Sequence, residues 1–186
     1  MNIIKSFFHL LKFGNKLILN GKLITGENVK INKHVRFDGK VEILDNSTIE
    51  DNCELRNCII GPGTIIKKGS ILNNCVVGSN VIIGPYARIR TKTDIGNGAQ
   101  VGNFVEIKNS YIGKKAKINH LAYVGDAKIG DNVIFGAGSV TCNYDGEKTN
   151  ETEIEKNSFI GSGVYLVAPI KIGFGSTIGS GSVITS

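Results

Sequence analysis

One histidine in the middle of the chain has polar and charged residues near it at regular spacings. His120 lies in the segment INHLAYVGDA (118–127), and Tyr123 follows it three residues later. Lys108 precedes His120 by twelve residues, and Arg90 precedes Lys108 by eighteen. An imidazole can accept a proton near neutral pH, while lysine and arginine bind phosphate and carboxylate groups. If the fold gathers these residues on one side, they form a base beside a cationic patch; the alternative is a structural histidine, hydrogen-bonded at a corner of the fold.

Other catalytic and metal-binding motifs are absent from the sequence. There is no Walker loop, no G-x-G-x-x-G after an expected strand and no G-x-S-x-G. The remaining histidines, His9 and His34, have no visible partner, so we expect no metal site. The four cysteines form no C-x-x-C pair, which favours free thiols in a reducing cytoplasm over a zinc site. The net charge of +6 is spread along the chain without a nucleic-acid-binding motif. We interpret this charge as a solvated surface, with phosphorylated ligands as the alternative.

Apolar residues recur at every sixth position along most of the chain, with a few one-residue slips. The series consists of Ile31, Phe37, Ile43, Ile49, Leu55, Ile60, Ile66, Leu72, Val77, Ile83, Ile89, Ile95, Val101, Ile107, Ile112, Ile118, Val124, Ile129, Phe135, Thr141, Ile154, Ile160, Leu166, Ile172, Ile178 and Ile184. A unit this short suits one strand and a tight turn. Three units make a triangular coil of about eighteen residues, and neighbouring coils stack about 4.8 Å apart. The repeat therefore predicts an all-β parallel β-helix, whose handedness cannot be read from the periodicity.

The slips and interruptions of the repeat predict local features. Two slips lie beside Cys58 and Cys75, seventeen residues apart, so we expect these thiols to stack in the core. The polar segment 142–153 lacks the repeat and predicts a loop that bulges from a corner. In residues 1–20, apolar residues near helical spacing predict a short helix that caps the array, with attachment to a membrane surface as the alternative. The apolar part is too short to span a bilayer. The β-helix domain is expected over residues 21–186.

From about residue 83 to residue 182 the sequence resembles a known family. The stretches IGPYARIR, VGNFVEIKNS, NHLAYVGDAKIGDNV, GAGSVTCNYDG and LVAPIKIG are similar to the acetyltransferase domain of the bifunctional bacterial enzyme that makes UDP-N-acetylglucosamine, a hexapeptide-repeat acyltransferase. Earlier residues resemble that family more weakly, and we expect no counterpart of its uridylyltransferase domain. The resemblance implies a left-handed parallel β-helix and a cytoplasmic homotrimer with sites between neighbouring prisms. It also implies acetyl transfer from acetyl-CoA to glucosamine 1-phosphate, in the supply of precursors for peptidoglycan and lipopolysaccharide.

The resemblance also implies roles for individual residues. His120 matches the general base, which would remove a proton from the amine before or during its attack on the thioester. Arg90, Lys108 and Tyr123 match residues that bind the acceptor, with the two cations holding the sugar phosphate. The positions that bind acetyl-CoA are matched by Ala137, Asn143, Tyr144, Ser162 and Ser180. No metal is implied for the transfer.

Several positions depart from the family pattern. Ile134 replaces an acceptor-binding asparagine, and Thr149 replaces a loop lysine, although Lys148 is adjacent. Gly163 and Tyr165 replace an aspartate and a glutamine, and the sequence ends before a C-terminal arm that supplies further contacts to CoA. We therefore expect acetyl transfer to glucosamine 1-phosphate, with two alternatives. In the first alternative, the acceptor is a different amino sugar or amine. In the second, the β-helix is a non-catalytic scaffold.

Overall fold

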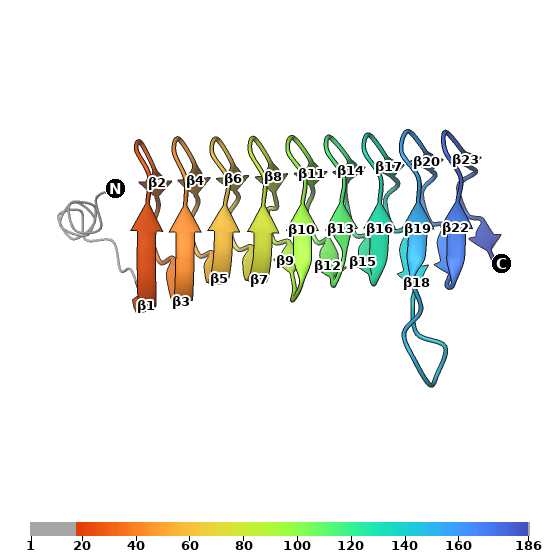
Figure 1. The fold of residues 1–186 in the computed structure, drawn as a ribbon, viewed down its shortest axis with the longest axis horizontal. Coiled ribbons are helices and arrows are strands. Elements are labelled where there is room, and N and C mark those ends of the chain that lie inside the picture. The colour runs from red at the N-terminus through yellow and green to blue at the C-terminus, as the bar shows by residue number, and fades with distance from the viewer. Residues whose placement is uncertain (1–17, 186) are drawn as a thin grey trace.

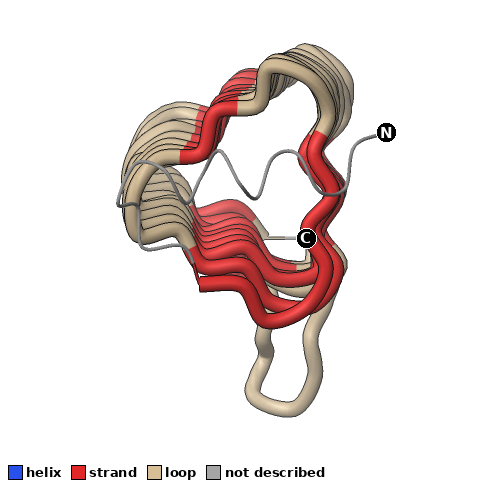
Figure 2. Tube along the Cα trace, turned by 90° about the vertical axis from the view of Figure 1, so that its left-hand side faces the viewer, coloured by secondary structure: helices blue, strands red, loops and turns tan. Residues whose placement is uncertain are grey.

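Stacked coils of the chain form a three-sided prism. The computed structural model describes residues 18–185, and within this range the chain contains strands and turns but no helix. The coils succeed one another along one axis (Figure 1), and the end-on view shows a triangular path (Figure 2). The predicted all-β parallel β-helix is confirmed.

The expected boundary at the N-terminal end needs a correction. Most of the predicted capping helix, residues 1–17, lies outside the described residues. Residues 18–20 belong to strand β1 (Ile18–Thr25), because they pair with the next coil from Ile18↔Arg36 onward. The first coil therefore begins three residues before the predicted start at residue 21.

One side of the prism, face 1, is a parallel sheet of nine two-residue strands. Each strand pairs in register with the strand of the next coil, as in Val101↔Ile118. The strands are β2 (Lys30–Ile31), β4 (Thr48–Ile49), β6 (Ile65–Ile66), β8 (Ile82–Ile83), β11 (Gln100–Val101), β14 (Lys117–Ile118), β17 (Ile134–Phe135), β20 (Phe159–Ile160) and β23 (Thr177–Ile178).

The other two sides are continuous at the N-terminal end and separate further along. The long strands β1, β3 (Arg36–Ile43), β5 (Glu54–Ile60) and β7 (Ile71–Val77) cross the corner between them. Beyond β7, face 2 consists of β9 (Arg88–Ile89), β12 (Glu106–Lys108), β15 (Tyr123–Gly125), β18 (Val140–Cys142), β21 (Tyr165–Val167) and β24 (Val183–Ile184). Face 3 consists of β10 (Thr93–Ile95), β13 (Tyr111–Ile112), β16 (Ala127–Ile129), β19 (Thr152–Ile154) and β22 (Ile170–Ile172).

The six-residue series fills the interior of the prism. Side chains alternate between the two sides of a strand, so one apolar residue of each short strand points inward. Ile107, Val124 and Ile129 are fully buried, and only Ile31, Ile178 and Ile184, in the coils near the two ends, are half-buried. No coil encloses its own core, so stability depends on contact between neighbouring coils.

The predicted cysteine stack is confirmed. Cys58 and Cys75 occupy the same register in β5 and β7, with their sulfur atoms 3.5 Å apart, and both are free thiols. A third thiol, Cys53, is also buried, and burial raises its pKa to about 11. These cysteines act as small apolar side chains in the core.

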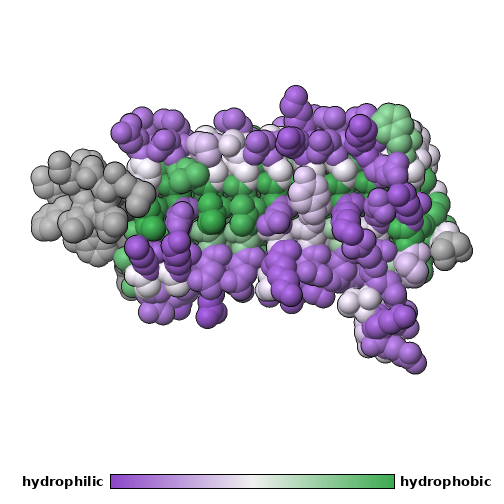
Figure 3. Space-filling model, viewed as in Figure 1, coloured by the Kyte–Doolittle hydropathy of each residue, from purple (hydrophilic) through white to green (hydrophobic). Residues whose placement is uncertain are grey.

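An exposed apolar patch lies on the long strands β5 and β7 and includes one residue of β13. Figure 3 shows apolar side chains between rows of polar side chains. Ile59, Val76 and Tyr111 are 40%, 46% and 48% exposed, and the aligned outward positions of the later coils are the charged Lys128, Glu153 and Lys171. In the described part of the chain, no helix has the length and apolar character needed to cross a membrane.

Candidate functional site

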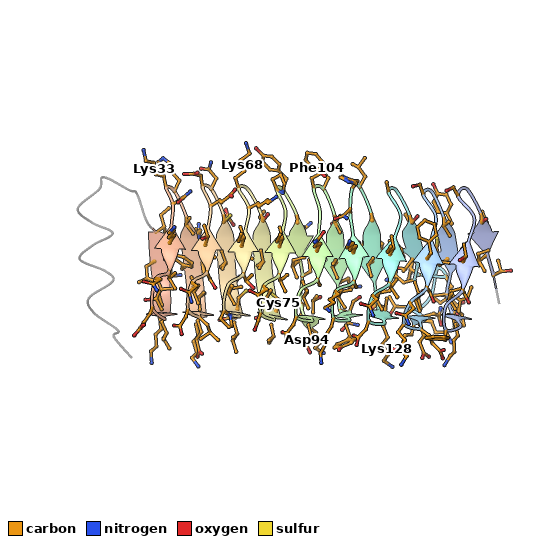
Figure 4. The ribbon with its side chains drawn as sticks, turned by 90° about the horizontal axis from the view of Figure 1, so that it is seen from above. Lys33, Lys68, Cys75, Asp94, Phe104 and Lys128 are labelled. Atoms are coloured by element: carbon orange, nitrogen blue, oxygen red, sulfur yellow. The ribbon has the colours of Figure 1, made fainter. Side chains whose placement is uncertain are left out.

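The corner between faces 1 and 2 carries a continuous column of residues, which we call the His120 corner. Leu121 N–H donates to the carbonyl of Asn103 in the preceding coil, and Gly138 N–H donates to the carbonyl of His120 (both 3.0 Å). The same pattern joins Gly163 N–H to the carbonyl of Ala137 and Gly181 N–H, next to Ser180, to the carbonyl of Ser162 in the coil before it, both at 2.8 Å. Figure 4 shows that Phe104, at this corner, lies on the same edge of the prism as Lys33 and Lys68. The structure therefore places His120, Ala137, Ser162 and Ser180 in successive coils of one column.

His120 lies on the surface at this corner, between β14 and β15. Its Nδ1 atom is 2.7 Å from the Oδ1 atom of Asn103. Its backbone has a φ of 65°, in the left-handed region that non-glycine residues rarely occupy. The imidazole is therefore held by one hydrogen bond and presents its other side to solvent.

The two predicted cations lie on face 2, in adjacent coils. Arg90 N–H donates to the carbonyl of Ile107, so Arg90 is aligned with Lys108. Each cation already has a carboxylate partner: Arg90 contacts Glu106 at 2.8 Å, and Lys108 contacts Asp126 at 3.4 Å. An anionic ligand at this face would meet two positive groups whose positions are set by these carboxylates.

Tyr123 lies on the same face, one coil beyond Glu106. Its hydroxyl reaches over Gly125, where a Cβ atom would lie 2.5 Å from the phenol oxygen. Gly125 in turn is aligned with Lys108, and the amide of Asn143 lies beside it. Because Gly125 has no side chain, the Tyr123 ring can pack over it, next to the amide of Asn143.

Asp126 joins Lys108 to the base of the bulged loop. The carboxylate, which is 11% exposed, accepts hydrogen bonds from Lys108, Asn109 at 2.6 Å and Asn143. Burial alone would raise the pKa of Asp126, but the hydrogen bonds from Asn109 and Asn143 and the charge of Lys108 outweigh it, so the pKa is lowered. The carboxylate is therefore ionised near neutral pH and ties the neighbouring coils together.

The loop leaves the prism between β18 and β19, as the break in the repeat predicts, and projects away from it in Figure 1. Asp145 organises this loop. Its carboxylate accepts hydrogen bonds from the backbone of Lys148 and Glu147 and from the side chain of Asn150, which lower the pKa of Asp145 to about 2. Tyr144 is 63% exposed on the loop, and its hydroxyl donates to the Gly146 carbonyl at 2.6 Å. The two residues of this segment that are predicted to bind acetyl-CoA therefore lie apart. Asn143 is buried at the base of the loop, and Tyr144 extends with the loop.

Ile134 lies on face 1, aligned with Lys117 and Phe159 of the adjoining coils. Ile134 is 43% exposed and Phe159 is 45% exposed, so the two make an apolar pair on the outside of the prism. Within residues 18–185, no group of three or more histidine, cysteine or acidic side chains is arranged to hold a metal ion.

Three polar residues at the site were missed from the sequence, namely Asn103, Glu106 and Asp126. The spacing that reveals two of them is the coil length itself. Asn103 precedes His120 by seventeen residues, and Lys108 precedes Asp126 by eighteen. Residues one coil apart share a corner or a face, so this spacing indicates contact.

The fold and the site together define a class. A family profile described as bacterial transferase hexapeptide (six repeats) matches residues 109–143 and 151–186, and one described as GMPPB C-terminal domain matches residues 19–93. Two solved acyltransferases of UDP-N-acetylglucosamine share the fold. The enzyme from Arabidopsis has a TM-score of 0.67 at 16% identity, covering 91% of this chain and 66% of its own. The enzyme from Campylobacter jejuni has a TM-score of 0.62 at 15% identity, covering 81% and 65%. The chain therefore carries the hexapeptide repeat of bacterial transferases and shares the fold of these acyltransferases.

Within that class, the chain is homologous to the acetyltransferase region of the bifunctional protein GlmU. It is 46% identical to the protein from Aromatoleum aromaticum over 92% of this chain. It is 48% identical to the protein from Nitrosomonas europaea over 90% of this chain. The matched region spans 38% and 36% of the length of these two relatives.

Proposed function

We propose that the protein transfers the acetyl group of acetyl-CoA to the amine of glucosamine 1-phosphate, a step in the formation of UDP-N-acetylglucosamine. The observation that carries the proposal is the column formed by His120, Ala137, Ser162 and Ser180. In this proposal His120 is the base at one end of the column, and an extended pantetheine arm lies along the small residues that follow it. The homology to bifunctional GlmU proteins supports the same reaction.

The chemistry begins with the acceptor. An ammonium group is not nucleophilic, so it must lose a proton, and His120 is the base in this proposal. The amine then attacks the thioester carbonyl and the C–N bond forms. The C–S bond breaks, and a proton lost by the attacking nitrogen protonates the leaving thiolate, which gives the amide and free CoA thiol. Arg90 and Lys108 hold the phosphate, with Tyr123 beside them, and position the amine.

Assembly and location are part of the proposal. One chain leaves the apolar patch of Ile59, Val76 and Tyr111 exposed, and packing of such patches between copies is consistent with a homotrimer. The four free thiols are consistent with the reducing cytoplasm. Light scattering of the purified protein measures the number of copies directly.

A second candidate acceptor is favoured by Ile134. This residue and Phe159 present an apolar surface where the family pattern predicts a hydrogen-bonding side chain. An aliphatic group cannot bond a sugar hydroxyl, so a different amino sugar or amine would suit this face better.

A thiol-release assay with acetyl-CoA and a panel of amino sugars separates these alternatives. Release with glucosamine 1-phosphate supports the first proposal, and release only with another acceptor supports the second. If a folded protein releases no thiol with any acceptor, the β-helix is a scaffold. An Ile134→Asn variant serves as the matched test of acceptor choice, with Phe159→Ala as the control for loss of apolar surface.

A further inference from the structure

The ring of His120 is held from one side by the coil beneath it. Asn103 occupies the position of the His120 corner in the preceding coil. It makes one contact to Leu121 and one to His120. Its backbone carbonyl accepts Leu121 N–H at 3.0 Å, and its side-chain Oδ1 is 2.7 Å from His120 Nδ1. The second contact has the length of a strong hydrogen bond and fixes the direction of the ring.

The backbone at His120 differs from the rest of the column. In the coils on either side, the left-handed corner residue is Phe104 or Gly138, with φ of 55° and 70°. In the His120 coil, two consecutive residues are left-handed, with φ of 65° at His120 and 57° at Leu121. Each such residue is strained, because its Cβ atom comes close to the following carbonyl oxygen. The strained turn redirects His120 relative to its neighbours, and the Asn103 hydrogen bond holds the ring in that direction.

We propose that Asn103 is a positioning residue that sets the tautomer of His120. A side-chain amide oxygen only accepts hydrogen bonds, so the imidazole nitrogen facing it must carry the proton. With the proton on Nδ1, the lone pair lies on Nε2, on the side of the ring that faces away from Asn103. A base needs that lone pair, so the catalytic consequence rests on the proposed function, whereas the tautomer itself does not.

The Asn103 amide turned the other way, with its nitrogen toward the ring, predicts the opposite tautomer of His120. If the amide nitrogen faced the ring, it would donate to Nδ1, the proton would move to Nε2, and the outward nitrogen could not accept a proton from a substrate. An aspartate at position 103 can only accept. Asn103→Asp therefore preserves the contact in the first orientation and reverses the tautomer in the second.

The first experiment measures the tautomer without any substrate. Nitrogen-15 NMR of histidine-labelled protein, at a pH where the imidazole is neutral, distinguishes the protonated ring nitrogen from the unprotonated one. The His120 signals are assigned by comparison with His120→Gln. We expect proton occupancy at Nδ1 in the parent and in Asn103→Asp, and a shift toward the Nε2-protonated form in Asn103→Ala. A parent ring protonated at Nε2 would overturn the proposal, whatever the activity of the protein.

The second experiment measures catalysis with whichever acceptor the thiol-release panel identifies. We expect Asn103→Ala to lower kcat roughly tenfold or more with little change in KM, because the lone pair is misdirected. We expect Asn103→Asp to retain most of the activity, with the acidic limb of its kcat/KM profile moved to higher pH, since a carboxylate stabilises the imidazolium.

A matched control separates positioning from stability. Asn32 also makes a coil-to-coil side-chain hydrogen bond, donating to Asp51 at 3.3 Å in the first coils of the prism. Asn32→Ala and Asn103→Ala should lower the melting temperature to a similar extent, and only Asn103→Ala should change the tautomer and kcat. Equal kcat in the parent and Asn103→Ala, with the tautomer unchanged, would show that Asn103 is only structural.

Discussion

The carboxylate of Asp126 is expected to hold the base of the bulged loop against face 2. Asp126→Asn tests this with little change in shape. The backbone of Asp126 has a φ of 50°, and asparagine tolerates that left-handed conformation, so the substitution adds no strain. It removes the negative charge and turns one accepting oxygen into a donor that faces the donors already present.

The size of the effect follows from the burial of the three partners. Lys108 is 32% exposed, and Asn109 is exposed. Water can therefore replace much of the hydrogen bonding that these two side chains lose. Asn143 is only 7% exposed, so the remaining oxygen of the variant is expected to face this amide, while its new N–H group faces the exposed amide of Asn109. A hydrogen bond to a charged group contributes about 1.5–3 kcal/mol and one to a neutral group about 0.5–1.5 kcal/mol, so we expect Asp126→Asn to lower the free energy of unfolding by about 1–2 kcal/mol at pH 7.

The pH dependence gives an independent check. The pKa of Asp126 is lowered in the folded protein, so its stabilising effect is complete above the ordinary pKa of 3.8 and is lost as the pH falls through the lowered value. Urea denaturation of the parent and variant should therefore differ at pH 7 and converge in acid. Asp131→Asn is the control, since Asp131 makes one exposed bond to Lys114 N–H, at 2.7 Å. Equal losses in the two variants, or a difference that persists unchanged in acid, would refute the role assigned to Asp126.

Two further outcomes are expected. Thr64 and Thr93 are both fully buried, but the hydroxyl of Thr64 bonds Gly78 and Val81, whereas that of Thr93 has no partner among the described residues. In urea denaturation, Thr64→Val should lose about 1–3 kcal/mol of stability and Thr93→Val should be neutral or stabilising; equal effects would contradict this. In the loop, the amide signals of Glu147 and Lys148 should follow the titration of Asp145, with a midpoint near its pKa of about 2. The turn is then complete above the ordinary pKa of 3.8 and opens as the pH falls through about 2, and a midpoint near 3.8 would show that these bonds are absent.

The interior of the prism could be predicted from the sequence because its period is strict. Each coil buries residues at fixed intervals, so the six-residue series identified Ile107, Val124 and the Cys58–Cys75 stack without knowledge of the structure. The series does not show where a strand bends around a corner without a break, as β7 does. The predicted start at residue 21 came from assigning residues 1–20 to a helix, and the repeat could not correct it, because Ile18 pairs through its backbone and is 45% exposed.

The site could be predicted only in part. Corner and face positions follow from the coil length, so the alignment of Arg90 with Lys108 could be anticipated from their spacing of eighteen residues. The hydrogen bonds that direct these side chains depend on rotamers and on the left-handed turn at His120, which the repeat does not specify. The coil-length spacing of Asn103 and Asp126 therefore indicates only that they lie near His120 and Lys108, whereas their hydrogen bonds emerge from the structure.

The role of His120 as the base is the central claim, and its removal tests it most directly. His120→Asn suits the test, because asparagine occupies several left-handed corner positions of this chain, such as Asn46 and Asn132, and should keep the turn. The measurement is the rate of thiol release from acetyl-CoA in the parent and the variant, with acetyl-CoA binding and circular dichroism recorded alongside. We predict a loss of roughly 10²–10⁴-fold with binding and fold unchanged. An equal rate in the two proteins would contradict the account.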